Sequence, residues 1–378
     1  MAEDDLTSAG ERAVSADRDI ARPAETNRCA EVRARVQSAG LPRTPDRRMP
    51  VRLLPWSPEY GTAMRMDAAE ADEADRGDVD LRVERDIWAP ITPGTTPPLR
   101  VRIVDGVRRA EAHALDDDLE GLPTFGLFAS YAVGVVACEP AAARVVDEAT
   151  EVVRQYLHTS VGAADRILRA GSARLDFRAR AVPQAKSADD LVDAMNRSML
   201  DAEAHLAESL SEDESWLTLV DGPLRGLRHP GRRVVGYIKR VQEWYVPARE
   251  VALLPTLLPG ERTPLFSIAA KGAGADHLRD GRYSWYVRIA HIEGPIHPLG
   301  GVLRLECSQA VGVEGARELA DLTATLLPRL ASSPVRDPRA PQNLTPTGAL
   351  EARLTHLLGD RRLIYRLLLT DLARGLVE

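Results

Sequence analysis

Two short motifs in the sequence join an aspartate to a following glycine. One is Asp105-Gly106 and the other is Asp221-Gly222, and each follows a run of apolar residues. We expect each aspartate to end a buried strand, beside a sharp turn at the rim of a sheet. Ligand sites of open α/β sheets collect at such strand ends. Because Asp-Gly is also a common turn pair, either motif alone has a purely structural interpretation.

A third carboxylate lies between the two motifs, in a helix predicted over residues 188–210. At about 100° per residue, Glu203 falls in the middle of an apolar stripe, whereas Asp201 and Glu208 fall on the opposite side. The stripe consists of Val192, Met195, Met199, Leu206 and Leu210. A carboxylate that faces the core is costly unless it is paired or binds a cation. Glu203 is therefore predicted either to form a salt bridge with a buried arginine or to bind a metal ion.

Together, Asp105, Glu203 and Asp221 are candidate metal ligands and catalytic residues. Three carboxylates suit Mn²⁺ or Mg²⁺, because these ions prefer hard oxygen donors. Such ions activate water and neutralise charge on the leaving oxygen, which is what phosphodiester hydrolysis needs. The three residues therefore point to this reaction class.

Lysine is rare in this chain, and one of its three lysines interrupts a strand predicted over residues 233–241. This lysine, Lys239, is preceded by Val234-Val-Gly-Tyr-Ile. A lysine offers a compact point charge for a phosphate and shifts its pKa more readily than an arginine does. We count Lys239 among the catalytic candidates, although a lysine without a role on a strand face would give the same pattern.

Arginines cluster after the second Asp-Gly motif and are the candidate nucleic-acid-binding residues. They are Arg225, Arg228, Arg232, Arg233 and Arg240. A basic loop beside the predicted site fits contact with a phosphate backbone, and a solvated charge run is the alternative. The net charge of -7 argues against a protein coated by nucleic acid, but it leaves room for a local basic cleft.

Strand and helix patterns are mixed along the chain, which indicates an α/β or α+β core. We expect strands over 99–103, 124–139, 215–220, 233–241, 265–270, 283–290 and 302–308, and helices over 141–168, 188–210 and 314–330, with two more between 348 and 377. Residues 1–94 are polar and poorly patterned. We expect them to form an N-terminal extension whose first part is either a partly disordered tail or a lone helix near residues 30–38.

Targeting and cysteine patterns favour a cytoplasmic protein. No run of about 18 apolar residues occurs, so no membrane span is expected. The first residues lack the apolar segment of a secretory signal. The three cysteines, Cys29, Cys138 and Cys307, are isolated from one another, which argues against a disulfide framework or a zinc knuckle.

Residues 95–378 resemble the NurA nuclease family, whose members are partners of HerA-type hexameric DNA translocases. The matching pieces are Val104-Asp105-Gly106, the helical Glu203, Asp221-Gly-Pro-Leu224, Gly236-Tyr-Ile-Lys239, the Arg304-Leu-Glu306 strand and the Pro-rich segment Asp337–Leu344. The resemblance implies an α/β fold with an RNase H-like mixed sheet core flanked by helices. It also implies Mn²⁺-dependent (or Mg²⁺-dependent) cleavage of DNA, as an exonuclease, a single-strand endonuclease or both. Further implications are a homodimer that docks on a HerA-type ATPase, and a role in DNA end resection, repair or defence.

Carried over residue by residue, Asp105, Glu203 and Asp221 match the acidic metal ligands of the family. Family members often have a histidine in the C-terminal helix, and this chain departs from them there. The residue in that role is left open among Gln342, Asn343, Glu351 and His356. Two other functions are compatible with the sequence. One is a non-catalytic assembly subunit that docks a hexameric DNA translocase, and the other is an RNase H-like enzyme that acts on RNA or on a structured nucleic acid.

Overall fold

The computed structural model describes twelve stretches of the chain. They are residues 52–53, 78–96, 100–117, 123–160, 163–171, 173–225, 227, 229–239, 244–270, 281–291, 299–333 and 341–374. The chain divides into units 1–48 and 49–378, and every element below belongs to the second unit. The helix predicted near residues 30–38 therefore lies outside the described residues. None of the helices in these stretches has the length and apolar character needed to cross a membrane.

Five strands form the centre of the sheet. β3 (Val101–Asp117), β4 (Pro123–Glu139) and β6 (Glu151–His158) are antiparallel neighbours. β9 (Leu217–Asp221) pairs parallel with β3, and β10 (Val234–Ile238) pairs parallel with β9. The resulting order, β6-β4-β3-β9-β10, with β4 antiparallel to the rest, is an RNase H-like core. The predicted fold class is confirmed.

Further strands widen this core on both sides. Beyond β10 follow β13 (Val302–Ser308), β12 (Arg282–Arg288), β11 (Phe266–Ile268) and β2 (Val79–Asp80), all antiparallel; beyond β6 follow β8 (Ala173–Ala181) and β7 (Arg166–Ala170). Two short strands stand off this path: β1 (Arg52–Leu53) pairs with β3 and β5 (Ala142–Val145) pairs with β4. The predicted strands from residue 215 onward are all present, with ends that shift by a few residues.

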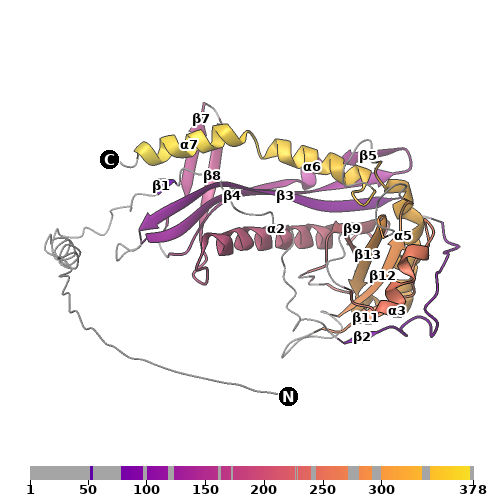
Figure 1. Ribbon diagram of the computed structural model, residues 1–378. Coiled ribbons are helices and arrows are strands. Elements are labelled where there is room, and N and C mark those ends of the chain that lie inside the picture. The colour runs from indigo at the N-terminus through magenta and orange to yellow at the C-terminus, as the bar shows by residue number, and fades with distance from the viewer. Residues whose placement is uncertain are drawn as a thin grey trace, which may run out of the picture. The chain divides into compact units, whose positions relative to one another are not determined.

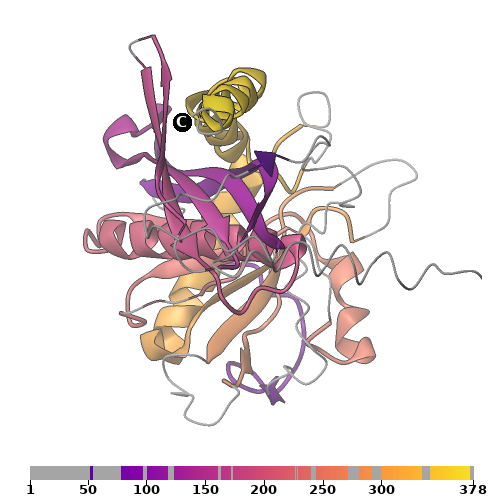
Figure 2. The same ribbon diagram turned by 90° about the vertical axis from the view of Figure 1, so that its left-hand side faces the viewer.

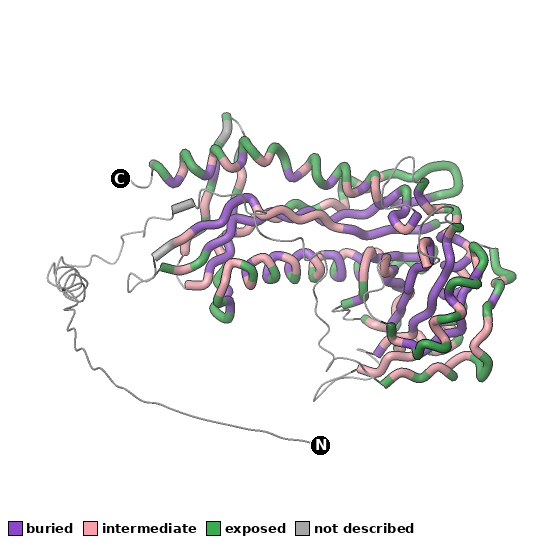
Figure 3. The backbone as a smooth tube through the Cα atoms, viewed as in Figure 1, coloured by how far each residue is buried: buried purple, intermediate pink, exposed green. Residues whose placement is uncertain are grey.

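Helices cover both faces of the sheet (Figures 1 and 2). α2 (Ala188–Leu210) lies along one face of β3 and β4. On the other face, α5 (Gly312–Leu330), α6 (Thr345–Leu357) and α7 (Arg361–Arg374) pack against the strands, while the short α3 (Ala248–Val251) follows β10. Because helices cover them on both sides, β3 and β4 run through the core as buried strands (Figure 3). The helix predicted over 188–210 is confirmed with the same bounds.

The helix predicted over residues 141–168 is wrong. That region contains β5, a 3₁₀ turn at Asp147–Ala149, β6 and the start of β7. The segment Glu151-Val-Val-Arg-Gln-Tyr-Leu-His158 is rich in β-branched and aromatic residues, which fit a pleated surface. It pairs along its whole length with the apolar strand β4, and this pairing outweighs the local helical spacing.

Part of the predicted N-terminal extension packs on the sheet. β2 pairs with β11, and Ile91 bridges Arg262. The guanidinium of Arg262 is almost fully buried and forms ion pairs with Glu84 (2.8 Å) and Asp321 (2.6 Å). Glu84 belongs to an acidic run of the sequence, so one charge of that run serves to tie residues 78–96 to α5.

Candidate metal centre

Asp105 and Asp221 lie next to each other on two parallel strands. The last pair between β3 and β9 joins Val104 to Val220, so the two aspartates follow directly. β9 ends at Asp221, and Gly222 turns the chain away with a φ of 112°. The sharp turn predicted at this second aspartate is present.

The turn predicted after Asp105 is wrong. β3 continues as far as Asp117, and Gly106 pairs with Val133 of β4 in the middle of the strand. The site forms at this point because β9 leaves the sheet while β3 continues. Asp105 therefore lies where the parallel pairing of β3 with β9 ends.

Glu351 of α6 joins the two aspartates. One carboxylate oxygen from each of Asp105, Asp221 and Glu351 lies within 4.8 Å of the others. α6 is held there by Leu350 and Leu354, which are buried in the main core cluster. Of the four C-terminal residues left open by the sequence, Glu351 is the one that joins this group, whereas His356 is exposed at the far end of the helix.

Glu203 approaches the same region from α2, on the opposite face of the sheet. It is 3% exposed, as its place in the apolar stripe predicts. Its Oε1 atom lies beside Gly106, the residue that follows the first aspartate. Glu203 forms no ion pair with an arginine of the described residues; burial raises its pKa, and the charge of Arg108 offsets only part of that rise. The salt-bridge alternative is therefore not realised in this part of the chain.

The placement predicted for Glu208 on the polar side of α2 is wrong. Glu208 is buried, and its carboxylate accepts a hydrogen bond from the backbone N–H of His229. The loop after β9 folds back over the end of α2 and covers it, which a helical wheel of α2 alone does not reveal. Asp201 is exposed, as predicted.

Burial and mutual repulsion raise the pKa of the carboxyls at this centre. Burial raises the pKa of Asp105 well above its ordinary value, with contributions from the charges of Asp221 and Glu203. Burial and the charge of Asp221 raise the pKa of Glu203 to about 8. Burial also raises the pKa of Asp221, although the nearby ammonium of Lys239 opposes it.

The donor set fits a divalent cation. Asp105 Oδ2 is buried and has no hydrogen-bond partner within the described part of the chain. A buried, unpaired carboxylate oxygen is costly, and a bound cation would compensate for it. Since all the converging donors are carboxylate oxygens, the site suits Mn²⁺ or Mg²⁺ better than a softer ion.

Lys239 lies at the edge of the carboxylate group. Its Nζ atom forms an ion pair with Asp221 Oδ2 and donates a hydrogen bond to Asn343 Oδ1 at 2.6 Å. The neighbouring Tyr237 shares a hydrogen bond with Thr347 of α6, with 2.9 Å between the two hydroxyl oxygens. β10 therefore connects the second aspartate to the helix that carries Glu351.

The turn after Asp221 is fixed by two contacts. The backbone N–H of Leu224 donates to Glu306 Oε1 at 2.8 Å, and the other carboxylate oxygen of Glu306 pairs with Arg304 at 2.7 Å. A side chain on Gly236 would meet the carbonyl oxygen of Gly222 at 2.6 Å, so β10 packs directly against this turn. The Arg304-Leu-Glu306 strand thus holds the Asp221-Gly-Pro-Leu224 segment in place.

The predicted nucleic-acid-binding arginines have different surroundings. Arg225 is exposed. Arg232 pairs with Glu212 (3.3 Å) and Arg233 with Glu318 (2.8 Å). The remaining two, Arg228 and Arg240, lie outside the described residues. A role of this loop in binding nucleic acid stays a prediction.

The curated proteins give no match to this chain. Among solved structures, the chain is similar to the crystal structure of the NurA nuclease from Sulfolobus solfataricus, with 10% identity and a TM-score of 0.39, over 72% of this chain and 86% of that chain. The family model described as the NurA domain matches residues 125–345.

The matched region contains Glu203, Asp221 and Lys239, whereas Asp105 and Glu351 lie just outside it. It spans more than half of the 378 residues, and it includes the strands and the helix that form the RNase H-like core after β3. This protein belongs to the NurA family.

Proposed function

We propose that this protein is a deoxyribonuclease that uses Mn²⁺ or Mg²⁺ to hydrolyse phosphodiester bonds. The observation that carries the proposal is the convergence of Asp105, Asp221 and Glu351 within 4.8 Å, with Glu203 beside them. Membership of the NurA family supports a nuclease-type function with DNA as the substrate. Three converging carboxylates, with a fourth close by on the other face of the sheet, have no stabilising structural role, since they repel one another and lose hydration.

Each residue has a chemical task in this proposal. Asp105, Asp221 and Glu351 would hold the cation, and Glu203 would complete the negative charge of the site. The bound ion supplies activated water and neutralises charge on the leaving oxygen. Lys239, held by Asp221 and Asn343, places a compact positive charge where a scissile phosphate could contact it. The arginines of the loop after β9 would contact the phosphate backbone of the DNA away from the cleaved bond.

The biological setting is also part of the proposal, and the motif resemblance supports it. We expect residues 95–378 to act as the nuclease domain, to form a homodimer and to dock on a HerA-type ATPase. A cytoplasmic role in DNA end resection, repair or defence follows from a DNA substrate and such a partner.

A cleavage assay with and without Mn²⁺, on linear duplex and on single-stranded DNA, tests the function. We expect the wild-type protein to cleave only with the metal, and Asp105→Asn to lose cleavage. Asp193→Asn, which changes an exposed aspartate of α2, is the matched control and should cleave normally. If Asp105→Asn cleaves like the wild-type protein, the catalytic assignment is wrong. If the wild-type protein does not cleave even with a HerA-type ATPase, the assembly-subunit alternative is favoured.

A further inference from the structure

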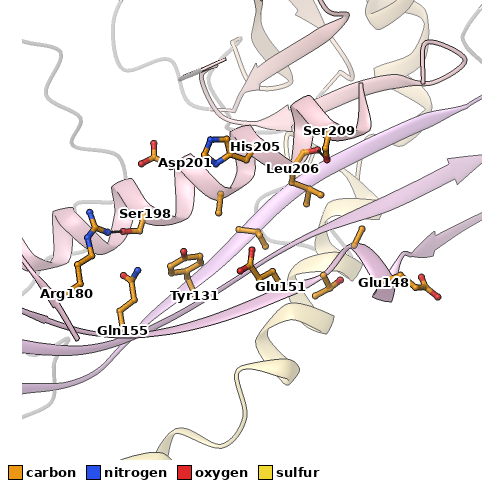
Figure 4. A pocket seen from close by; sticks show the side chains of 14 residues that line it. Tyr131, Glu148, Glu151, Gln155, Arg180, Ser198, Asp201, His205, Leu206 and Ser209 are labelled. Atoms are coloured by element: carbon orange, nitrogen blue, oxygen red, sulfur yellow. Dashed lines mark hydrogen bonds between the residues drawn. The ribbon is translucent and has the colours of Figure 1, made fainter. Parts of the chain in front are cut away.

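A second polar site lies on the α2 face of the sheet. It is a cleft of about 590 Å³ between α2 and strands β4, β6 and β8 (Figure 4). Tyr131, Glu151 and Gln155 line it from the strands, and Asp201 and His205 line it from the helix. None of the proposed metal ligands is among its lining residues.

The charges around the cleft are mainly negative. Glu148, Glu151 and Asp201 contribute three carboxylates from three different elements. Among the described residues that line the cleft, only Arg180 has a permanent positive charge, and its guanidinium already donates a hydrogen bond to Ser198 Oγ. Such a lining repels phosphates, so we do not expect a DNA strand to bind there.

A nearly buried tyrosine without a hydrogen-bond partner points into the cleft. Gln155, which also lines the cleft, has an amide oxygen that is closed to solvent and has no hydrogen-bond partner among the described residues, so a ligand reaches it only after the side chain turns. Tyr131 is 7% exposed, and its hydroxyl likewise makes no hydrogen bond in the described part of the chain. Buried polar groups are normally satisfied by protein, ordered water or a ligand, because leaving them unpaired is costly. The cleft therefore offers the hydroxyl of Tyr131 together with excess negative charge.

We propose that this cleft binds an arginine side chain presented by a partner protein. A guanidinium is planar and carries five N–H donors, so one group can contact the carboxylate of Glu151 and the hydroxyl of Tyr131 together. Bidentate pairs of arginine with carboxylate are among the strongest charged hydrogen bonds. The volume of the cleft is that of sites for drug-sized ligands, and this leaves space for the residues that flank the arginine. Apolar residues of the lining, Val133 and Leu206, would contact those neighbours.

Titration of the full-length, metal-free protein with the peptide acetyl-Gly-Arg-Gly-amide, followed by calorimetry or NMR, tests the proposal. The matched probe contains citrulline, which keeps the shape of arginine without its charge. We expect saturable binding of the arginine peptide and binding of the citrulline peptide that is weaker by about tenfold or more. Glu151→Gln and Asp201→Asn should each weaken binding of the arginine peptide several-fold. Asp193→Asn, on the same helix as Asp201, should leave that binding unchanged.

Several results would overturn the proposal. They are a lack of saturable binding at millimolar peptide, equal binding of the two peptides, or unchanged binding by both folded carboxylate variants. Tighter binding of spermidine than of the peptide would identify a polyamine site instead, and competition by an oligothymidylate would identify a nucleic-acid site. Glu151 and Asp201 lie on different elements, so a folding defect in one variant leaves the other as a test. Because no metal or cleavage is involved, the outcome is independent of the proposed nuclease activity.

Discussion

The carboxylate of Glu203 lies in the space that a side chain at Gly106 would need. A Cβ atom at position 106 would lie 2.5 Å from Glu203 Oε1 and 3.0 Å from Met199 Cγ. Glu203 comes from α2, whereas Asp105 faces the helices on the other side of the sheet. The glycine therefore lets a carboxylate from one face approach the aspartate pair on the other, and the Asp105-Gly106 motif acts through close packing rather than through a turn.

Gly106→Ala should displace Glu203 and Met199 without changing any proposed ligand. We expect slower cleavage, by about tenfold or more, because a shift near 1 Å in a catalytic group is enough for such losses. Gly315→Ala in α5 is the control, since its Cβ would meet Val311 at an ordinary 3.6 Å. That variant should keep full activity and gain slightly in stability. Normal cleavage by Gly106→Ala would mean that Glu203 has no part in the reaction.

Glu351→Gln should weaken Mn²⁺ binding and cleavage together. An amide offers a neutral oxygen in place of a charged one, and even partners outside the ligand shell change metal affinity by about 10–100-fold. We therefore expect a loss of at least about 100-fold in cleavage, with Mn²⁺ affinity measured separately by calorimetry. His356→Ala, on the exposed end of the same helix, is the control. If His356→Ala is the more damaging change, the C-terminal site residue has been assigned incorrectly.

The raised pKa of Glu203 predicts how the stability of the metal-free protein depends on pH. Its pKa is about 8 in the folded protein against an ordinary 4.5. Between these values the folded protein keeps a proton that the unfolded chain has released, so the free energy of unfolding falls as pH rises. Glu203→Gln should remove much of this fall, as measured by urea unfolding at about pH 5 and pH 8.

Added Mn²⁺ should stabilise the protein more at the higher pH, because the ion binds the deprotonated carboxylates. Equal pH slopes for the wild-type protein and Glu203→Gln would contradict the assignment of this proton. Equal stabilisation by Mn²⁺ at both pH values would contradict binding of the ion to these carboxyls.

The sequence predicts those elements whose pattern has only one interpretation. The buried strand at 124–139, the helix at 188–210 and the strand at 302–308 are correct within a residue, because their apolar runs or stripes fit one structure only. The helix prediction for residues 141–168 is wrong because the apolar spacing there fits a helix as well as a strand. Pairing with β4, which the local sequence does not show, selects the strand. The prediction that Asp105 ends its strand fails for a similar reason. The pairing that extends β3 beyond Asp105 is made with β4, which follows later in the chain.

The sequence leaves the C-terminal site residue open among four alternatives, although it carries a signal that favours Glu351. This residue falls on the same side of its helix as the buried residues Thr347, Leu350 and Leu354. This is the pattern that singled out Glu203, and a helical projection of residues 345–357 would have favoured Glu351. The contacts of Glu208 and the cleft on the α2 face depend on loops and strands that meet only in the folded chain.

A buried ion cluster holds the end of α6 on the strand that carries Asp105. The guanidinium of Arg109 donates to the carbonyl oxygens of Leu358 (3.1 Å) and Gly359 (2.9 Å), and Arg154 donates to Leu358 as well (2.9 Å). Carbonyls at a helix C-terminus lack partners within the helix and attract cations. β3 therefore fixes both the first aspartate and the far end of the helix that carries Glu351.

Glu111 orients this cluster and is predicted to position Glu351. Its side chain is fully buried, and both of its oxygens lie 2.9 Å from nitrogens of Arg109. Glu111→Gln leaves Arg109 without its counter-charge, and breaking a buried pair in this way costs about 3–5 kcal/mol of unfolding free energy. We also expect Mn²⁺ affinity to fall by about tenfold in the protein that remains folded, as for other groups that orient metal ligands. Glu111→Asp keeps the negative charge, so it should retain part of the unfolding free energy and part of the Mn²⁺ affinity that Glu111→Gln loses. If Glu111→Gln lowers stability while Mn²⁺ affinity stays unchanged, the cluster supports the fold only, because α6 then keeps its register without it.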